Sequence, residues 1–213
     1  MKRYIILFLL PVALLMNSCT KDLTATDYSE INPNIFPKSA EDLEAMVNAC
    51  YYPVRGSWWD GLFSTSERGS QFINDATTEI LFGKFGEQQL ASLQSYKPSD
   101  AGITRFYDDF YNKISRMTLT IDLIQNSTVG DDLKKKAIAE VRCARGLLAY
   151  TLFDMFGPLV IAPLEVLKNP LQEKPLARLT NEEMVAFIDA DLEAAIPDLP
   201  APQDAEYGRF SKA

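Results

Sequence analysis

Apolar side chains recur at intervals of three and four residues over four stretches of the chain, which is the spacing of one face of an α-helix. The stretches cover residues 39–51, 103–125, 130–156 and 180–197. In SAED and TNEE a Ser or Thr stands three residues before an acidic residue, which predicts a capping box at the start of the first and the fourth helix. The pattern therefore predicts a mostly α fold.

The same intervals predict which side chains of each helix face the core. They are Leu43, Met46, Val47, Cys50 and Tyr51 in the first helix; Phe106, Phe110, Ile114, Met117, Ile121 and Ile124 in the second; Leu133, Ala137, Val141, Ala144, Leu148, Leu152 and Met155 in the third; and Val185, Ile188, Leu192 and Ala195 in the fourth. Gly146 interrupts the third helix at a cost of about 1 kcal/mol relative to alanine. We expect a neighbouring helix to come close to the backbone at this glycine.

The second and third helices are joined by the short link NSTVGD, a length typical of an antiparallel αα-hairpin. Such a pair cannot cover its own apolar face, so it needs further helices stacked against it, as in tetratricopeptide arrays. Long Pro-rich connectors, GPLVIAPLEVLKNPLQEKP and PDLPAPQDAEYG, flank the fourth helix. In the first connector, Leu159–Ala162 is an extended apolar piece that either crosses the surface or pairs as a short strand.

The amino terminus has a different pattern. Lys2 and Arg3 precede an apolar run from Tyr4 to Met16, and small polar residues then lead to Cys19. This run is shorter than the roughly 20 residues of a membrane-spanning helix, and the layout is that of a signal peptide. Residues 16–19, MNSC, resemble a bacterial lipobox. Cleavage at a lipobox leaves an amino-terminal cysteine that carries fatty-acyl chains such as palmitate. An ordinary cleaved signal, with an incidental Cys19, is the alternative.

These patterns divide the chain into three parts. We predict a lipoprotein signal peptide over residues 1–18, a lipid-anchored tether over residues 19–38 and a helical domain over residues 39–213. The tether segment TKDLTATDYSEINPNIFPK has no sustained period and contains turn-forming residues. Asp22 directly after Lys21 is similar to a surface-export signal of lipoproteins of the Bacteroidetes.

Composition excludes several classes of function. Among 213 residues, 29 are acidic and 21 basic, for a net charge of −8, which argues against nucleic acid as a partner. The chain contains no histidine, which removes Ser–His–Asp and Cys–His catalysis and most zinc sites. We therefore expect no metal site and no cofactor. Cys50 and Cys143 could pair in an oxidising compartment, but their inward positions favour two buried free thiols.

Four segments, in this order, resemble the SusD/RagB-like outer-membrane lipoproteins. FYDDFYNKISRMTLTIDLI matches through Tyr111 and Ile114, with Thr118 and its neighbours in place of the Asn of the family. EVRCARGLLAYTLFDMFGPLVIAP matches through Glu140, Arg145, Gly146, Tyr150, Phe153, Phe156, Gly157, Pro163 and Leu164. IDADLEAAIPDLP matches through Asp191, Leu192, Ala195, Leu199 and Pro200, and YGRFSKA through Gly208, Arg209, Ser211, Lys212 and Ala213.

The resemblance covers nearly all of this chain but only the amino-terminal part of a usual family member. Ala213 ends the chain two residues after the N-cap predicted at Ser211, so we expect a truncated gene or a partial record, with an incomplete array of tetratricopeptide-like helix pairs. An incomplete array leaves its last apolar face uncovered, so we expect poor stability and aggregation of this piece alone.

The resemblance also implies a role in nutrient uptake. Proteins of this family sit on the outer face of the outer membrane, held by a lipid anchor, and bind oligosaccharides or sometimes peptides. They deliver this ligand to a SusC-like TonB-dependent transporter and do not act as enzymes. The alternative is a helical-repeat lipoprotein that binds other proteins as a scaffold and binds no sugar.

Ligand contacts are expected in the stretch RGSWWDGLF. Trp58 and Trp59 stand in a turn-rich setting that could present their rings to a flat sugar face, with Arg55, Asp60 and Asn74 as hydrogen-bonding neighbours. The alternative is that one or both tryptophans pack in the core below the first helix, and that Arg55, Asp60 and Asn74 are solvated loop residues.

One pair of carboxylates could suggest an enzyme. Asp75 and Glu79 lie four residues apart, on one face if the segment is helical, and paired carboxylates serve glycoside hydrolysis. A chain with 29 acidic residues contains such a spacing by chance, so we expect no catalysis here.

Overall fold

The computed structural model describes residues 36–56, 60–64, 66, 69–84, 86, 95–169, 171 and 175–212. The α-helices are α2 (Ala40–Tyr51), α3 (Ser70–Ala76), α5 (Ala101–Gln125), α6 (Asp131–Phe156), α7 (Leu164–Lys168) and α8 (Asn181–Ala195), and the 3₁₀ turns are η1 (Tyr52–Val54) and η2 (Ile196–Asp198). These described residues contain no strand, which confirms the mostly α prediction. The predicted signal peptide, the cysteine predicted to carry the lipid (Cys19) and the predicted tether up to residue 35 lie outside the described residues.

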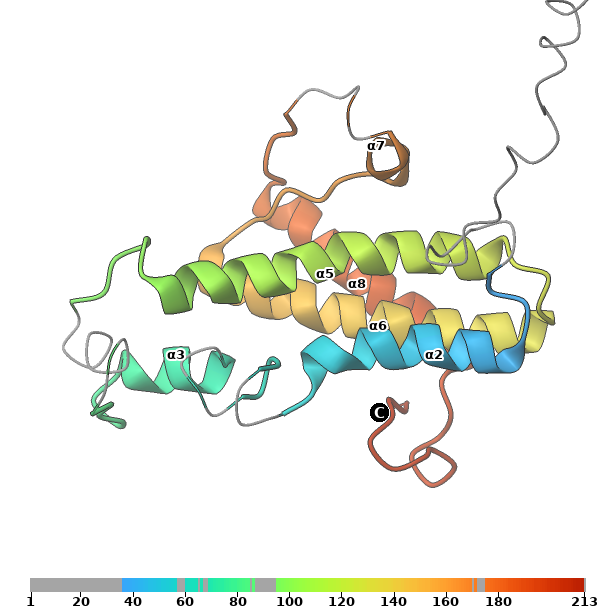
Figure 1. Ribbon diagram of the computed structural model, residues 1–213, viewed down its shortest axis with the longest axis horizontal. Coiled ribbons are helices and arrows are strands. Elements are labelled where there is room, and N and C mark those ends of the chain that lie inside the picture. The colour runs from blue at the N-terminus through green and yellow to red at the C-terminus, as the bar shows by residue number, and fades with distance from the viewer. Residues whose placement is uncertain are drawn as a thin grey trace, which may run out of the picture. The chain divides into compact units, whose positions relative to one another are not determined.

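Helix α6 is the centre of the fold. It packs against α5, α8 and α2, and Figure 1 shows α5 running beside it as an antiparallel partner. Helix α2 lies along a second side of α6, and α8 lies behind it in this view. This arrangement confirms the predicted αα-hairpin and the prediction that further helices cover its apolar faces.

Both predicted capping boxes start their helices. The Ser39 hydroxyl accepts a hydrogen bond from the Asp42 backbone N–H, and the Asp42 carboxylate accepts one from the Ser39 N–H. Thr180 and Glu183 make the same reciprocal pair at the start of α8. These bonds satisfy backbone donors that a helix leaves free in its first turn, and they fix where α2 and α8 begin.

The core follows the predicted periodicity most closely in α5, where all six expected residues are buried. In α6 the middle of the predicted face is buried, but Met155 is only half-buried and Leu133 is 47% exposed. Leu133 was therefore assigned wrongly to the core. It lies in the first turn of α6, beside an open groove between α6 and α2, where no described helix covers it.

The predicted inner face of α8 is wrong at two of four positions. Ile188 and Ala195 are buried as expected, but Val185 and Leu192 are 45% and 36% exposed. Met184 and Asp191 face inward instead. The buried face of α8 thus differs from the predicted face because it contains Asp191, which forms a buried ion pair with Arg145. A prediction based on apolar residues places an aspartate on the exposed face instead.

Gly146 has the role that the sequence predicts. A Cβ atom at this position would stand 3.0 Å from Leu192 Cδ2 and 3.6 Å from Asp191 Cβ, so the glycine lets α8 approach α6 closely.

Both described cysteines are free, as favoured. Cys50 is buried and Cys143 half-buried, and burial raises the pKa of each thiol from 9.0 to about 11.

Candidate functional site

The segment after α2 brings an aromatic ring, a cation and a carboxylate together. Arg55 Nη2 lies 3.1 Å from Asp60 Oδ1, and the Arg55 guanidinium carbon lies 3.9 Å from the centroid of the Tyr52 ring. The Tyr52 hydroxyl donates a hydrogen bond to the other Asp60 oxygen, which raises the pKa of Tyr52. We call these three residues the Tyr52 cluster. It is solvent-accessible, so its groups are available to a polar ligand.

Backbone contacts hold the chain that carries this cluster. Gly61 has φ of +100°, a conformation that favours glycine, and a Cβ there would stand 2.2 Å from the Arg55 carbonyl oxygen. The next residue, Leu62, is 1% exposed and donates its N–H to the Pro53 carbonyl at 2.7 Å. Ser70, the first residue of α3, donates to the Leu62 carbonyl from both its N–H and its hydroxyl. Leu62 therefore anchors the segment on the core.

The predicted ligand residues have different outcomes. Arg55 and Asp60 contact each other, whereas Asn74 belongs to α3, where its side chain is exposed. Trp58 and Trp59 lie outside the described residues. Tyr52, which contacts both Arg55 and Asp60, was not among the residues singled out from the sequence.

The suspected pair of carboxylates does not share a helix face. Helix α3 ends at Ala76, so Asp75 is in its last turn and Glu79 lies beyond it. The condition attached to this pair, a helix through both residues, is not met.

Exposed apolar side chains lie in the same part of the chain. Phe63 is 52%, Ile80 88% and Phe82 65% exposed. Single exposed apolar residues are ordinary, but apolar and aromatic side chains with a few polar groups are the usual lining of small-molecule sites.

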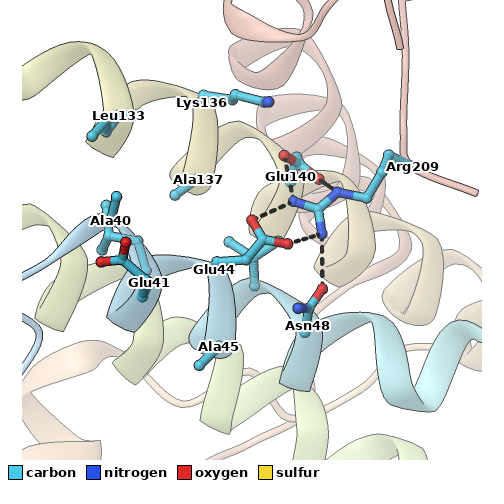
Figure 2. A pocket seen from close by; sticks show the side chains of 12 residues that line it. Ala40, Glu41, Glu44, Ala45, Asn48, Leu133, Lys136, Ala137, Glu140 and Arg209 are labelled. Atoms are coloured by element: carbon cyan, nitrogen blue, oxygen red, sulfur yellow. Dashed lines mark hydrogen bonds and ion pairs between the residues drawn. The ribbon is translucent and has the colours of Figure 1, made fainter. Parts of the chain in front are cut away.

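A second polar cluster joins three distant segments, as Figure 2 shows. Arg209 Nη1 donates to Glu44 Oε1 at 2.9 Å and to Asn48 Oδ1 at 2.8 Å, both on α2. Its Nη2 donates to Glu44 Oε2 at 3.1 Å and to Glu140 Oε1, on α6, at 3.2 Å. The Arg209 Nε lies 2.8 Å from Glu140 Oε2, so each guanidinium nitrogen contacts a carboxylate. We call this group the Arg209 clasp.

Tyr51 and Phe210 extend the clasp. The Tyr51 hydroxyl donates to Glu140 Oε2 at 2.7 Å and accepts from the Phe210 N–H at 2.7 Å, and the two rings stack at 4.8 Å. Burial, together with the hydrogen bond to Glu140, raises the pKa of Tyr51. Burial opposes the charge of Arg209, but Glu140 and Glu44 outweigh it, and the pKa of Arg209 is raised.

A third polar cluster ties α5, α6 and α8 together. Arg145 donates from Nε and Nη2 to the two Asp191 oxygens, each at 2.6 Å, in a bidentate pair. Its Nη1 donates to the Thr118 hydroxyl at 2.7 Å. Thr118 stands where the SusD-like motif described above has an Asn. Its hydroxyl supplies a polar partner to Arg145 at this position. With Arg145 8% and Asp191 2% exposed, this ion pair is buried where the three helices meet.

A groove of about 520 Å³ lies between α2 and α6, and Arg209 closes one end of it (Figure 2). Small residues such as Ala40, Ala45 and Ala137 line it together with Glu41 and Lys136.

Among the residues that the structure describes, no group of three potential ligands could hold a metal ion. In the same residues, no helix has the length and apolar character needed to cross a membrane.

A family model described as "Starch-binding associating with outer membrane", SusD-like, matches residues 27–213. The chain belongs to the SusD-like family. This confirms the resemblance seen in the four sequence motifs. A curated SusD-like protein of Bacteroides ovatus is 26% identical over 175 residues, which cover 79% of this chain and 30% of that protein.

Solved structures share the fold of this SusD-like chain. A SusD superfamily protein from Bacteroides vulgatus ATCC 8482 matches with a TM-score of 0.66 and 18% identity, over 82% of this chain and 37% of its own. A laminarin-binding SusD-like protein matches with a TM-score of 0.64 and 23% identity, over 82% of this chain and 38% of its own. The chain thus spans about a third of the length of these relatives. The tetratricopeptide-like helical fold is confirmed.

Proposed function

We propose that this chain is part of a carbohydrate-binding protein associated with the outer membrane. The family match over residues 27–213 carries this proposal, and one similar structure is that of a laminarin-binding protein. The Tyr52 cluster supports it, because an exposed aromatic ring beside a charged pair suits an oligosaccharide.

In this proposal the ligand lies against the segment from Tyr52 to Asp60. Sugar C–H faces stack on aromatic rings, which Tyr52, Trp58 and Trp59 would supply. Sugar hydroxyls both donate and accept, so they can bind the Asp60 carboxylate and the Arg55 guanidinium. The Asn74 amide on α3 is the further polar group that we assign to this site.

We further propose that the protein is a lipoprotein anchored through Cys19 and facing the cell exterior. In this role it binds its ligand without cleaving it and delivers it to a SusC-like TonB-dependent transporter. Two acyl chains would hold it stably, whereas one gives only marginal anchoring. Mass spectrometry of the protein from cells should find a lipidated amino-terminal Cys19, and an unmodified one would contradict the anchor.

Ligand binding can be tested by electrophoresis of the protein through gels that contain single polysaccharides, with laminarin first. We expect retardation by at least one glycan, and loss of it in Trp58→Ala, Trp59→Ala, Arg55→Ala or Asp60→Ala. Asp189→Asn, an exposed substitution on α8, is the control and should leave retardation unchanged. Equal retardation of all variants would contradict the proposed site.

The groove between α2 and α6 favours a second candidate function. Its small side chains would let a helix of another protein approach both helices, which suits a protein-interaction scaffold that binds no sugar. Purification from cells distinguishes the two, because the scaffold should bring assembly proteins with it and the carbohydrate-binding protein should bring a transporter.

A further inference from the structure

Two consecutive tyrosines at the end of α2 belong to different clusters. Tyr51 is half-buried and binds Glu140 and the Phe210 backbone, in the Arg209 clasp. Tyr52 is exposed and binds Asp60, in the candidate ligand site. The two clusters therefore meet at one peptide bond, where α2 passes into η1.

Hydrogen bonds also connect the clusters through the backbone. Arg209 binds the side chain of Asn48, and the Asn48 carbonyl accepts the N–H of Tyr52. The Tyr51 carbonyl accepts the N–H of Arg55 at 3.1 Å. In both of these backbone bonds the acceptor belongs to a residue whose side chain is part of the clasp.

The clasp comes from a part of the chain that is remote in sequence. Arg209 and Glu44 are 165 residues apart, and Glu140 joins them from the central helix α6. Lys212 holds the segment that contains Arg209 at a second point. Its N–H donates to the Pro200 carbonyl at 2.8 Å, and its Nζ donates to the Pro197 carbonyl at 3.1 Å. Residues 209–212 therefore form a strap held at both ends.

We propose that Arg209 and Phe210 are positioning residues for the Tyr52 cluster. They hold Asn48 and Tyr51, and through these residues they fix the direction in which the chain leaves α2 toward Arg55 and Asp60. The inference rests on the proposed function only in treating the Tyr52 cluster as a ligand site. The coupling between the strap and this cluster can be measured without any sugar.

Hydrogen–deuterium exchange of the full chain, followed by mass spectrometry, tests the coupling. Arg209→Lys keeps the charge but loses the planar three-nitrogen contact, and Phe210→Ala removes the stacked ring. We expect the hydrogen-bonded amides of Tyr52, Arg55 and Leu62 to exchange about fivefold faster, the factor for losing one net hydrogen bond of ordinary strength. The amides of α5 should keep their protection.

Arg145→Lys is the matched control, because it weakens an arginine of similar side-chain exposure, 10% against 13% for Arg209, in the cluster that joins α5, α6 and α8. It should leave exchange of the Tyr52, Arg55 and Leu62 amides unchanged. Unchanged exchange in both strap variants would overturn the inference, and so would a uniform increase throughout α2 and α6. If Phe210→Ala fails to fold, Arg209→Lys alone decides.

Sugar binding then separates the inference from the proposed function. Where the wild type binds a glycan, Arg209→Lys should bind it more weakly while keeping its helical content. A wild type that binds none of the glycans overturns the proposed function, whereas the exchange result still decides whether the strap positions the Tyr52 cluster.

Discussion

At the scale of single residues, three buried charged side chains define how the helices fit together. Glu140, Arg145 and Asp191 are at most 8% exposed, and each has an opposite charge within hydrogen-bond distance. A buried charge without its partner is strongly destabilising, so each of these residues depends on its partner staying in place.

Replacing Asp191 with Asn should expose this dependence. The guanidinium of Arg145 would remain buried without a counter-charge, so we expect the free energy of unfolding to fall by about 3–5 kcal/mol in urea titrations. Lys168→Ala, which removes the more exposed pair of α7 with Asp122, should cost about 1 kcal/mol or less. Similar losses in the two variants would contradict the role of the buried pair.

The two thiols predict a pH dependence of stability. Because folding raises each pKa from 9.0 to about 11, the folded chain keeps protons that the unfolded chain releases between these values. The contribution is complete below pH 9.0 and is lost as the pH rises through about 11. Unfolding measured across this range should show a decline that is smaller in the Cys50→Ala, Cys143→Ala double variant. An equal slope in both proteins would contradict burial of the thiols.

At the scale of helices, apolar periodicity predicted α5 completely because that helix buries only apolar side chains at its inward positions. It failed in α8 because Asp191 replaces an apolar residue on the buried face, and no pattern of single residues shows that Arg145 compensates its charge. The close contact between α6 and α8 at Gly146 could be predicted, because a glycine inside a helix lowers its stability and is expected only where a side chain would not fit.

The contact at Gly146 gives a test at this scale. A leucine there would push Leu192 and Asp191 away, and such overpacking should cost about 1–3 kcal/mol. Alanine should be nearly neutral, because its gain in helix propensity offsets the shift of the partly exposed Leu192 side chain. Urea unfolding of Gly146→Leu, alone and with Leu192→Ala, measures this; no loss in the single variant would contradict the close approach.

At the scale of the whole molecule, the sequence motifs predicted the family and the helical architecture, but not how distant segments combine. Glu140 and Arg209 were both recognised as motif residues, yet their contact joins the centre of the chain to its end. The spacing of residues along the chain does not predict the Tyr52 cluster either, because this cluster depends on the turn at Gly61. The predicted tryptophan site lies outside the described residues and stays a prediction.

The most direct test of the proposed carbohydrate site is isothermal titration of the glycan that retards the protein in gels into the wild type, Asp60→Asn and the control Asp189→Asn. We expect the wild type and the control to bind equally, and Asp60→Asn to bind at least about tenfold more weakly, since a hydrogen bond to a charged group contributes about 1.5–3 kcal/mol. Binding that is the same in all three proteins would contradict the site, and absence of binding across a wider glycan panel would contradict the proposed function.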